Sequence, residues 1–248
     1  KNIISVRASL NRPCNLALIN GEGRETSLGA FATTDSKLSY SPTGKRIYWS
    51  ENIPDLRWSL KSTSAIRYIE DGKARKRSLT KGLRLYNPTP HPSEGTVAAV
   101  EHKENTTTAI TLINPDTGSP IKSVLLPAGM QAVDLTWYED RIIFSALTSS
   151  GYGLYSLQDG KPTTLLQPQS VKMENLKTRG SDILFTCDRT GVNELYAYSI
   201  ADGSLYQLTS TRYGSNHHEF SEDGKWLVMS VNSHEGKIVH RAAAADLL

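Results

Sequence analysis

One stretch decides the fold, Phe220-Ser-Glu-Asp-Gly-Lys-Trp-Leu-Val-Met-Ser230. Its Asp223-Gly224 pair favours a tight turn, because Gly adopts positive φ without cost and Asp tolerates it. The following segment, Trp226–Ser230, is rich in β-formers and apolar enough to be buried on both faces. The same pattern occurs earlier, as Tyr40-Ser-Pro-Thr-Gly-Lys-Arg-Ile-Tyr-Trp-Ser50. Two copies of this unit, far apart in one chain, indicate a repeat protein.

The turn followed by an apolar strand recurs along the chain. The residue before the strand is, in order, Gly44, Gly95, Asp140, Ser181 and Gly224. These positions are about 45 residues apart on average, close to the roughly 40–45 residues of a four-stranded propeller blade. Helical periodicity is nearly absent, and only the tail 242–248 favours a short helix.

A hairpin signal occupies the same later slot of four units. It is found at Asp71-Gly72, Asp116-Thr-Gly118, Asp159-Gly160 and Asp202-Gly203. Asp-Gly between alternating apolar strands is the strongest short-range signal for a hairpin. Because one blade cannot bury both of its faces alone, neighbouring units must stack.

The sequence therefore predicts an all-β fold, a β-propeller of four-stranded antiparallel blades that forms one domain over residues 1–248. Six blades fit the length best. The first unit lacks a strand at its start and the last lacks its fourth. Both a ring closed from the two termini and a fragment of a larger array would show this, so a five-bladed or incomplete propeller stays open. The expected blades are 1–36, 37–87, 88–134, 135–176, 177–218 and 219–248.

Composition excludes several classes of protein. Of the 248 residues, 38% are hydrophobic and 21% charged, which is ordinary for a globular protein. The net charge of +3, from 28 basic and 25 acidic residues, is too balanced for a nucleic-acid-binding protein. No stretch approaches the roughly 20 apolar residues of a membrane span. The basic run 73–77 follows a hairpin turn and is expected to be a solvated sheet edge.

The two cysteines, Cys14 and Cys187, allow one disulfide but no metal-binding pair of the C-x-x-C type. Since Cys187 follows the apolar run Ile183-Leu-Phe-Thr, we expect it to be a buried free thiol. The chain begins at Lys1 rather than Met, which fits a processed protein or an excised domain.

The repeated motif resembles that of a known family. The segment Ser41-Pro-Thr-Gly-Lys-Arg-Ile-Tyr-Trp-Ser50, closed by Ser78-Leu-Thr80, is similar to the WD40-like repeat of TolB-type propellers. So is Ser221–Ser230 with Gln207-Leu-Thr209. The same repeat builds the non-catalytic propellers of tricorn-like and prolyl-oligopeptidase-family peptidases. The resemblance implies a propeller in an extracytoplasmic setting, periplasmic or extracellular. It is nearly silent on function, because the residues that it fixes are turn and core positions.

No catalytic or cofactor motif is present, so the sequence predicts neither an enzyme nor a bound cofactor or metal. A G-x-S-x-G elbow and the Gly-rich phosphate loops are absent. The H-E-x-x-H motif fails at its second histidine in both His218-Glu-Phe-Ser-Glu222 and His234-Glu-Gly-Lys-Ile238. A glycosidase with two carboxylates from distant blades stays open, with Glu174 and Glu219 as its candidate acids.

Polar residues precede the inner strands and predict a ligand-binding rim beside the channel of a propeller. Because side chains alternate across a strand, only one of His217 and His218 can face the channel. The alternative is a histidine hydrogen-bonded to a neighbouring blade. The predicted rim residues are Tyr86, Asn87, Gln131, Glu174, Asn175, Asn216, His217, His218 and Glu219.

The longest loop between strands, Glu51-Asn-Ile-Pro-Asp-Leu-Arg-Trp-Ser59, is the second candidate. Loops on a rigid scaffold often carry function. Asp55, Arg57 and Trp58 are predicted to bind a partner, since an exposed Trp beside Arg is a typical interface anchor. The alternative is that Trp58 folds back onto its blade while Asp55 and Arg57 form a pair.

We therefore expect a non-catalytic extracytoplasmic scaffold that binds a protein or peptide, as one domain of a longer exported bacterial protein. A small polar ligand stays open, and nucleic acid is not expected. An accessory or gating propeller of a peptidase and a carbohydrate-active propeller enzyme are the alternatives.

Overall fold

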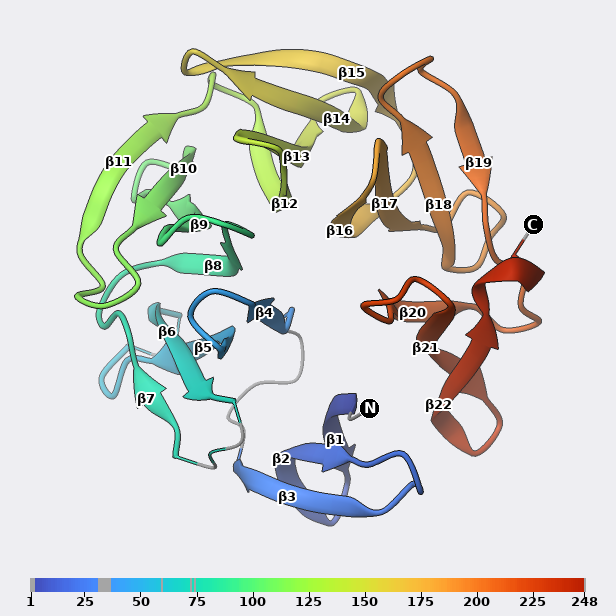
Figure 1. Cartoon of the computed structure of the whole chain (residues 1–248). Coiled ribbons are helices and arrows are strands. Elements are labelled where there is room, and N and C mark those ends of the chain that lie inside the picture. Colours follow the sequence, from blue (N-terminus) through green and yellow to red (C-terminus); the bar gives the residue numbers. More distant parts are fainter. Residues whose placement is uncertain (1–2, 31–36, 59, 72, 74, 248) are drawn as a thin grey trace. The chain divides into compact units, whose positions relative to one another are not determined.

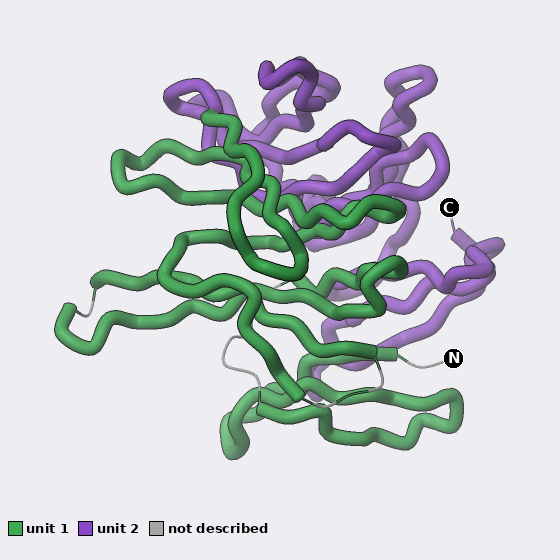
Figure 2. The backbone as a smooth tube through the Cα atoms, turned by 60° about the vertical axis from the view of Figure 1, so that its left-hand side comes forward, with its two compact units in different colours: residues 1–125 green, residues 126–248 purple. Residues whose placement is uncertain are grey.

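The structure is a computed structural model that describes residues 3–30, 37–58, 60–71, 73 and 75–247. Almost all of its regular structure is β (Figure 1). The fold is an all-β six-bladed propeller of small antiparallel sheets, as the repeat predicts. By contacts between Cα atoms the chain divides into two compact units, residues 1–125 and 126–248 (Figure 2).

The first unit contains three sheets, each with its strands in sequence order or its reverse. The first sheet has three strands, β1 (Ile3–Ser9), β2 (Arg12–Ile19) and β3 (Glu25–Ala30). The second has four, β4 (Ser39–Ser41), β5 (Arg46–Pro54), β6 (Ser62–Glu70) and β7 (Arg77–Ser78). The third has four, β8 (Leu85–Pro90), β9 (Val97–His102), β10 (Thr108–Ile113) and β11 (Pro120–Leu125).

The second unit repeats this plan. Two sheets have four strands: β12 (Gln131–Tyr138), β13 (Arg141–Thr148), β14 (Gly151–Gln158) and β15 (Lys161–Gln169), then β16 (Met173–Arg179), β17 (Asp182–Cys187), β18 (Glu194–Ser199) and β19 (Leu205–Gln207). The last has three, β20 (Ser215–Phe220), β21 (Trp226–Ser233) and β22 (Gly236–Ala243). The expected short first and last units are thus confirmed.

At the tail, where a short helix was expected, β22 extends to Ala243 and a single turn of 3₁₀ helix, η1 (Ala244–Asp246), follows. Leu248 lies outside the described residues, as do Gly72 of the expected Asp71-Gly72 turn and Ala74 of the basic run. Strands β8, β12, β16 and β20 each begin ahead of the blade boundary expected from the repeat.

Alternation along the strands builds the core, because successive side chains point to opposite faces of a sheet. In β5, Tyr48 packs against the third sheet with Leu85, while its neighbour Trp49 packs against the first sheet with Leu16. Tyr48 and Trp49 are each only 1% exposed. The tyrosine and the tryptophan that end the first repeat motif therefore join three blades.

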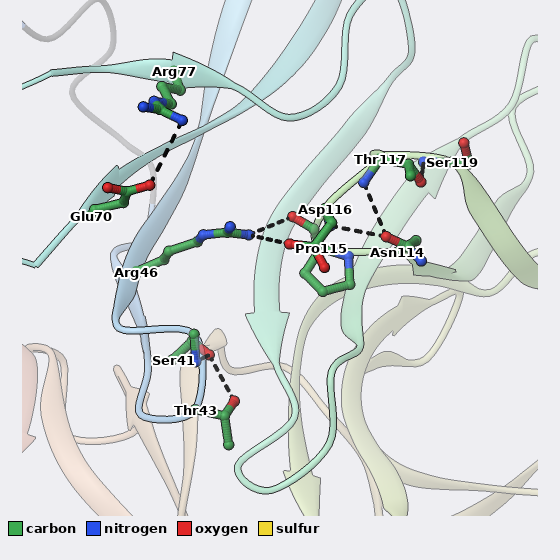
Figure 3. Close-up of polar contacts among 11 residues, drawn as sticks. Ser41, Thr43, Arg46, Glu70, Arg77, Asn114, Pro115, Asp116, Thr117 and Ser119 are labelled. Atoms are coloured by element: carbon green, nitrogen blue, oxygen red, sulfur yellow. Dashed lines mark hydrogen bonds and ion pairs between the residues drawn. The ribbon is translucent and has the colours of Figure 1, made fainter.

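Arg46 links the second and third sheets on the surface (Figure 3). Its Nη1 donates to the carbonyl of Pro115 at 2.7 Å and to a carboxylate oxygen of Asp116 at 3.1 Å. Its guanidinium also lies 4.8 Å from the centre of the Tyr68 ring. A planar cation held by a carboxylate, a carbonyl and an aromatic face suits arginine rather than lysine.

Cys187 is 3% exposed and makes no disulfide, as expected, and Cys14 is also a free thiol. Burial raises the pKa of the Cys187 thiol, because its thiolate would be poorly solvated there.

Candidate functional site

The predicted rim residues lie where the first strand of a sheet bulges. The register of β8, β16 and β20 against the next strand shifts at Asn87, Asn175 and His217. All three residues have positive φ, at 51°, 57° and 53°. A bulge leaves one residue unpaired and re-aims the neighbouring side chains, which is typical of sites next to function. Strand β12 has a similar shift, between Ala132 and Asp134.

In the first unit the rim residues are half-buried. The ring of Tyr86 meets that of His102 edge-on, with centroids 5.2 Å apart. The backbone N–H of Asn87 donates to Ser50 Oγ at 3.1 Å. Both residues are therefore anchored to neighbouring strands.

In the second unit, two rim carboxylates are paired with lysines. Glu174 accepts from Lys172 Nζ at 2.8 Å, and Glu219 forms an ion pair with Lys177. Gln131 is exposed and Asn175 is half-buried.

The two histidines lie in opposite environments. His217 is exposed, whereas His218 is 4% exposed and lies between the last two sheets. His218 Nε2 is 2.8 Å from Ser215 Oγ, and its Nδ1 is 3.3 Å from Thr186 Oγ1 on β17. This is the arrangement of a histidine hydrogen-bonded to a neighbouring blade. Asn216, 8% exposed, accepts from Asn193 Nδ2 at 2.8 Å.

The pKa of His218 is lowered to about 3, chiefly because burial disfavours the charged ring, and further by Lys177 and His217. Ser215 donates its hydroxyl proton to Glu194 Oε2 at 2.9 Å, so the Nε2 of a neutral His218 must donate to Ser215. The imidazole is thus neutral and fixed in one tautomer at physiological pH.

Glu194 is the centre of this network, and it was not among the residues predicted from the sequence. It is 1% exposed and accepts from the hydroxyls of Thr209, Thr211 and Ser215. Although an acid, a serine and a histidine meet here, the acid contacts the serine rather than the histidine. Ser215 is also fully buried, at 0% exposure. A nucleophilic triad needs an accessible serine and an acid on the imidazole, so this arrangement is structural.

In the sequence, the signal for this network was the Leu-Thr pair that stands at the end of two copies of the repeat. Thr209 Oγ1 accepts from the Leu195 N–H at 2.9 Å, and Thr80 Oγ1 accepts from the Ile66 N–H at 2.9 Å. In the second sheet the buried acid is Glu51, which accepts from Trp49 Nε1, Arg67 Nε and Lys76 Nζ. The repeated threonine therefore satisfies an unpaired backbone donor of the third strand.

Backbone hydrogen bonds shape the loop between β5 and β6 on both sides of Ser59, which lies outside the described residues. Asp55 Oδ1 accepts from the N–H groups of Arg57 and Trp58 at 2.8 and 3.2 Å. The Asp55 N–H donates to the Lys61 carbonyl, and the Lys61 N–H to the Trp58 carbonyl, both at 2.9 Å. The hydrogen bond from the Arg57 N–H lowers the pKa of Asp55, as does that from Trp58. Asp55 therefore shapes the loop through its backbone, and among the described residues it forms no ion pair with the Arg57 side chain.

The loop presents its apolar side chains to solvent. Trp58 is 67% exposed, and Leu56 and Leu60 are 104% and 102% exposed. Trp58 thus does not fold back onto its blade. The two leucines were not predicted, although Leu56, Trp58 and Leu60 alternate through a polar loop.

A shallow hollow of about 470 Å³ lies beside the loop, lined by Trp58, Leu60, Lys61, Ser62 and Arg84. Arg84 comes from the segment that leads into β8, far along the chain from the loop. The two segments meet because Ser64 of β6 bonds to the carbonyls of Leu83 and Leu85. The structure therefore places the loop close to the segment that holds Tyr86 and Asn87.

No protein-family model matches this sequence, and no curated protein matches it. Solved structures do match it. TolB from Acinetobacter baumannii superposes with a TM-score of 0.76 over 98% of this chain, at 16% identity, and this chain spans 61% of that protein's length. A TolB-like protein from Agrobacterium tumefaciens gives 0.65 over 88% of this chain and 83% of its own, also at 16% identity.

The propeller domain of the Trilobed protease from Pyrococcus furiosus superposes with a TM-score of 0.61, at 11% identity, over 99% of this chain and 92% of its own. These likenesses confirm the resemblance to TolB-type and peptidase propellers at the level of the fold. In the described part of the chain, no helix is long and apolar enough to cross a membrane.

Proposed function

We propose that this chain is a non-catalytic β-propeller that binds a protein or peptide partner outside the cytoplasm, as one domain of a longer exported bacterial protein. The observation that carries the proposal is the β5–β6 loop, where Asp55 holds the backbone of Arg57 and Trp58 and the side chains of Leu56, Trp58 and Leu60 are exposed. Large apolar side chains clustered on a surface mark interaction sites. The extracytoplasmic setting rests on the resemblance to TolB-type propellers.

Three features of the loop suit a partner site. Its tryptophan lies beside Arg57, and these two residue types are enriched among the anchors of protein interfaces. Its backbone is held by Asp55. The segment that pairs with β6 through Ser64 and the Leu85 carbonyl continues into Tyr86 and Asn87, both of which carry hydrogen-bonding groups. We propose that these residues form the rim of the partner site.

The remaining rim residues of the second unit are proposed as a weaker, polar contact region. Exposed Gln131, His217 and Glu219 offer hydrogen-bonding groups to a peptide or sugar. The catalytic alternatives have less support. The acid–serine–histidine cluster is buried, and Glu174 and Glu219 are both paired with lysine.

A second candidate function is an accessory propeller beside a peptidase domain. The likeness to the propeller of the Trilobed protease favours it. The sequence of the whole gene separates the two candidates, because a peptidase domain encoded next to this chain would support the second.

Site-directed photo-crosslinking tests the partner proposal. We expect a photoreactive phenylalanine analogue at position 58, introduced in the source organism, to form an adduct with one protein that mass spectrometry identifies. The same analogue at position 206 is the control, because Tyr206 is also exposed, at 48%, but lies in the other unit. Equal adducts from both positions, or none from position 58, would contradict the proposal.

A further inference from the structure

We infer that the hollow beside Trp58 recognises a peptide segment in which a carboxylate lies next to an apolar side chain. This rests on the proposed function and narrows its partner to one chemical class. The hollow has an apolar side and a cationic side, and each of them excludes some ligands.

Trp58 and Leu60 form the apolar side. Their side chains are 67% and 102% exposed. This apolar surface is in contact with water, and an apolar group of a ligand would cover it. Each square ångström removed from water contributes about 25 cal/mol. A small hydrophilic anion bound alone would leave this surface wet, so an anion is not sufficient as a ligand.

Lys61 and Arg84 are the cations that line the hollow, and Ser62 also lines it. Both cations are exposed, and among the described residues neither has a carboxylate within ion-pair distance. The nearby Asp55 carboxylate already accepts two backbone N–H groups. The cationic side therefore has donors to offer a ligand.

The electrostatic effect of Arg84 is visible at a neighbouring residue. The pKa of His102 is lowered by burial first and by the charge of Arg84 second. A wholly apolar segment laid into the hollow would cover both cations without pairing them, which is costly. A carboxylate would instead accept paired hydrogen bonds from the Arg84 guanidinium.

The size of the hollow fits this class of ligand. About 470 Å³ lies within the roughly 300–1,000 Å³ of ligand sites and has room for a short run of side chains rather than a folded domain. The carboxylate can belong to an Asp or Glu side chain or to the C-terminus of the partner. Both present the same group to Arg84 and Lys61, so the experiment must separate them.

Fluorescence anisotropy with three labelled peptides tests the inference on the whole chain at low ionic strength. The first has Leu-Glu-Phe at its centre, flanked by Gly and Ser and amidated at the C-terminus. The second carries Gln in place of Glu. The third ends in Leu-Phe with a free carboxylate and has no acidic side chain. We expect the Glu peptide or the free-carboxylate peptide to bind about tenfold more tightly than the Gln peptide. Whichever of the two it is identifies the source of the carboxylate.

Variants of the chain test whether the preference for a peptide with a carboxylate arises in the hollow. We expect Arg84→Gln to abolish the tenfold preference and Trp58→Ala to weaken every peptide. Arg24→Gln is the matched control, because Arg24 is an exposed arginine of the same unit outside the hollow. It should change nothing.

Three results would overturn the inference: equal binding of the Glu, Gln and free-carboxylate peptides, a preference that survives Arg84→Gln, or no binding at about 1 mM peptide. Equal binding that still requires Trp58 would leave the scaffold proposal intact and remove only the carboxylate. Vesicles of anionic phosphatidylglycerol that bind through Trp58, when no peptide does, would replace the peptide with a membrane surface.

Discussion

His218 predicts a specific loss of stability in mild acid. In the native state the pKa of this buried ring is about 3, against 6.5 for an ordinary histidine. Between these values the unfolded chain binds a proton that the native chain does not, so acidification favours unfolding. The contribution of His218 to stability is complete above about pH 6.5 and falls by about 1.4 kcal/mol for each pH unit below it, until about pH 3.

The variant His218→Gln removes this titration and keeps a polar side chain. At pH 7.5 the variant should be less stable, because the bonds to Ser215 and Thr186 are disturbed. At pH 5 the wild-type protein carries the penalty of about 2 kcal/mol and the variant does not. The difference in unfolding free energy between the two proteins should therefore shrink by about 2 kcal/mol from pH 7.5 to pH 5.

Urea unfolding followed by tryptophan fluorescence measures this difference at both pH values. His240→Gln is the control, since His240 is exposed on β22 of the same sheet and is not among the groups that lower the pKa of His218. This control should keep the wild-type dependence on pH. If the stability gap between wild type and His218→Gln stays constant from pH 7.5 to pH 5, the buried ring does not resist protonation and the reasoning is refuted.

Three further outcomes follow from burial. Trp58→Ala should change the free energy of unfolding by less than about 0.5 kcal/mol in urea, because the side chain is largely exposed; a larger loss would mean that Trp58 supports the fold. Glu51→Gln should lower the melting temperature, because it removes the buried negative charge and one of the two acceptor oxygens shared by three donors, including Lys76; an unchanged temperature would contradict that role. In a thiol-reagent assay Cys14 should react in the native protein and Cys187 only after unfolding; fast native labelling of Cys187 would show that its burial is wrong.

The fold could be predicted because each copy of the repeated motif contains both the core residues and the turn residues of a blade. Tyr48 and Trp49 end one copy of the motif, and the alternation of a strand sends them to opposite faces. The pair Leu-Thr was recognised as a repeat signature, but its cause, a threonine hydroxyl that accepts from a backbone N–H of the third strand, needed coordinates.

The site was predicted less completely, for two physical reasons. Alternation alone could not assign His217 and His218, because the bulge at His217 interrupts the parity of the strand. Arg84 was missed because it reaches the loop through the pairing of Ser64 with the segment before β8, a contact between distant parts of the sequence.

Asp55 holds part of the backbone of the loop that exposes the apolar side chains. The hairpins β14–β15 and β20–β21 carry Asp-Gly at the turn, whereas here one carboxylate oxygen holds two successive N–H groups in a longer loop. Ordering a residue on binding costs conformational entropy. Because Arg57 and Trp58 are fixed before a partner arrives, less of the contact energy is lost to ordering. A partner bound at Leu56, Trp58 and Leu60, as proposed above, would therefore meet a loop whose backbone at Arg57 and Trp58 is already held by Asp55.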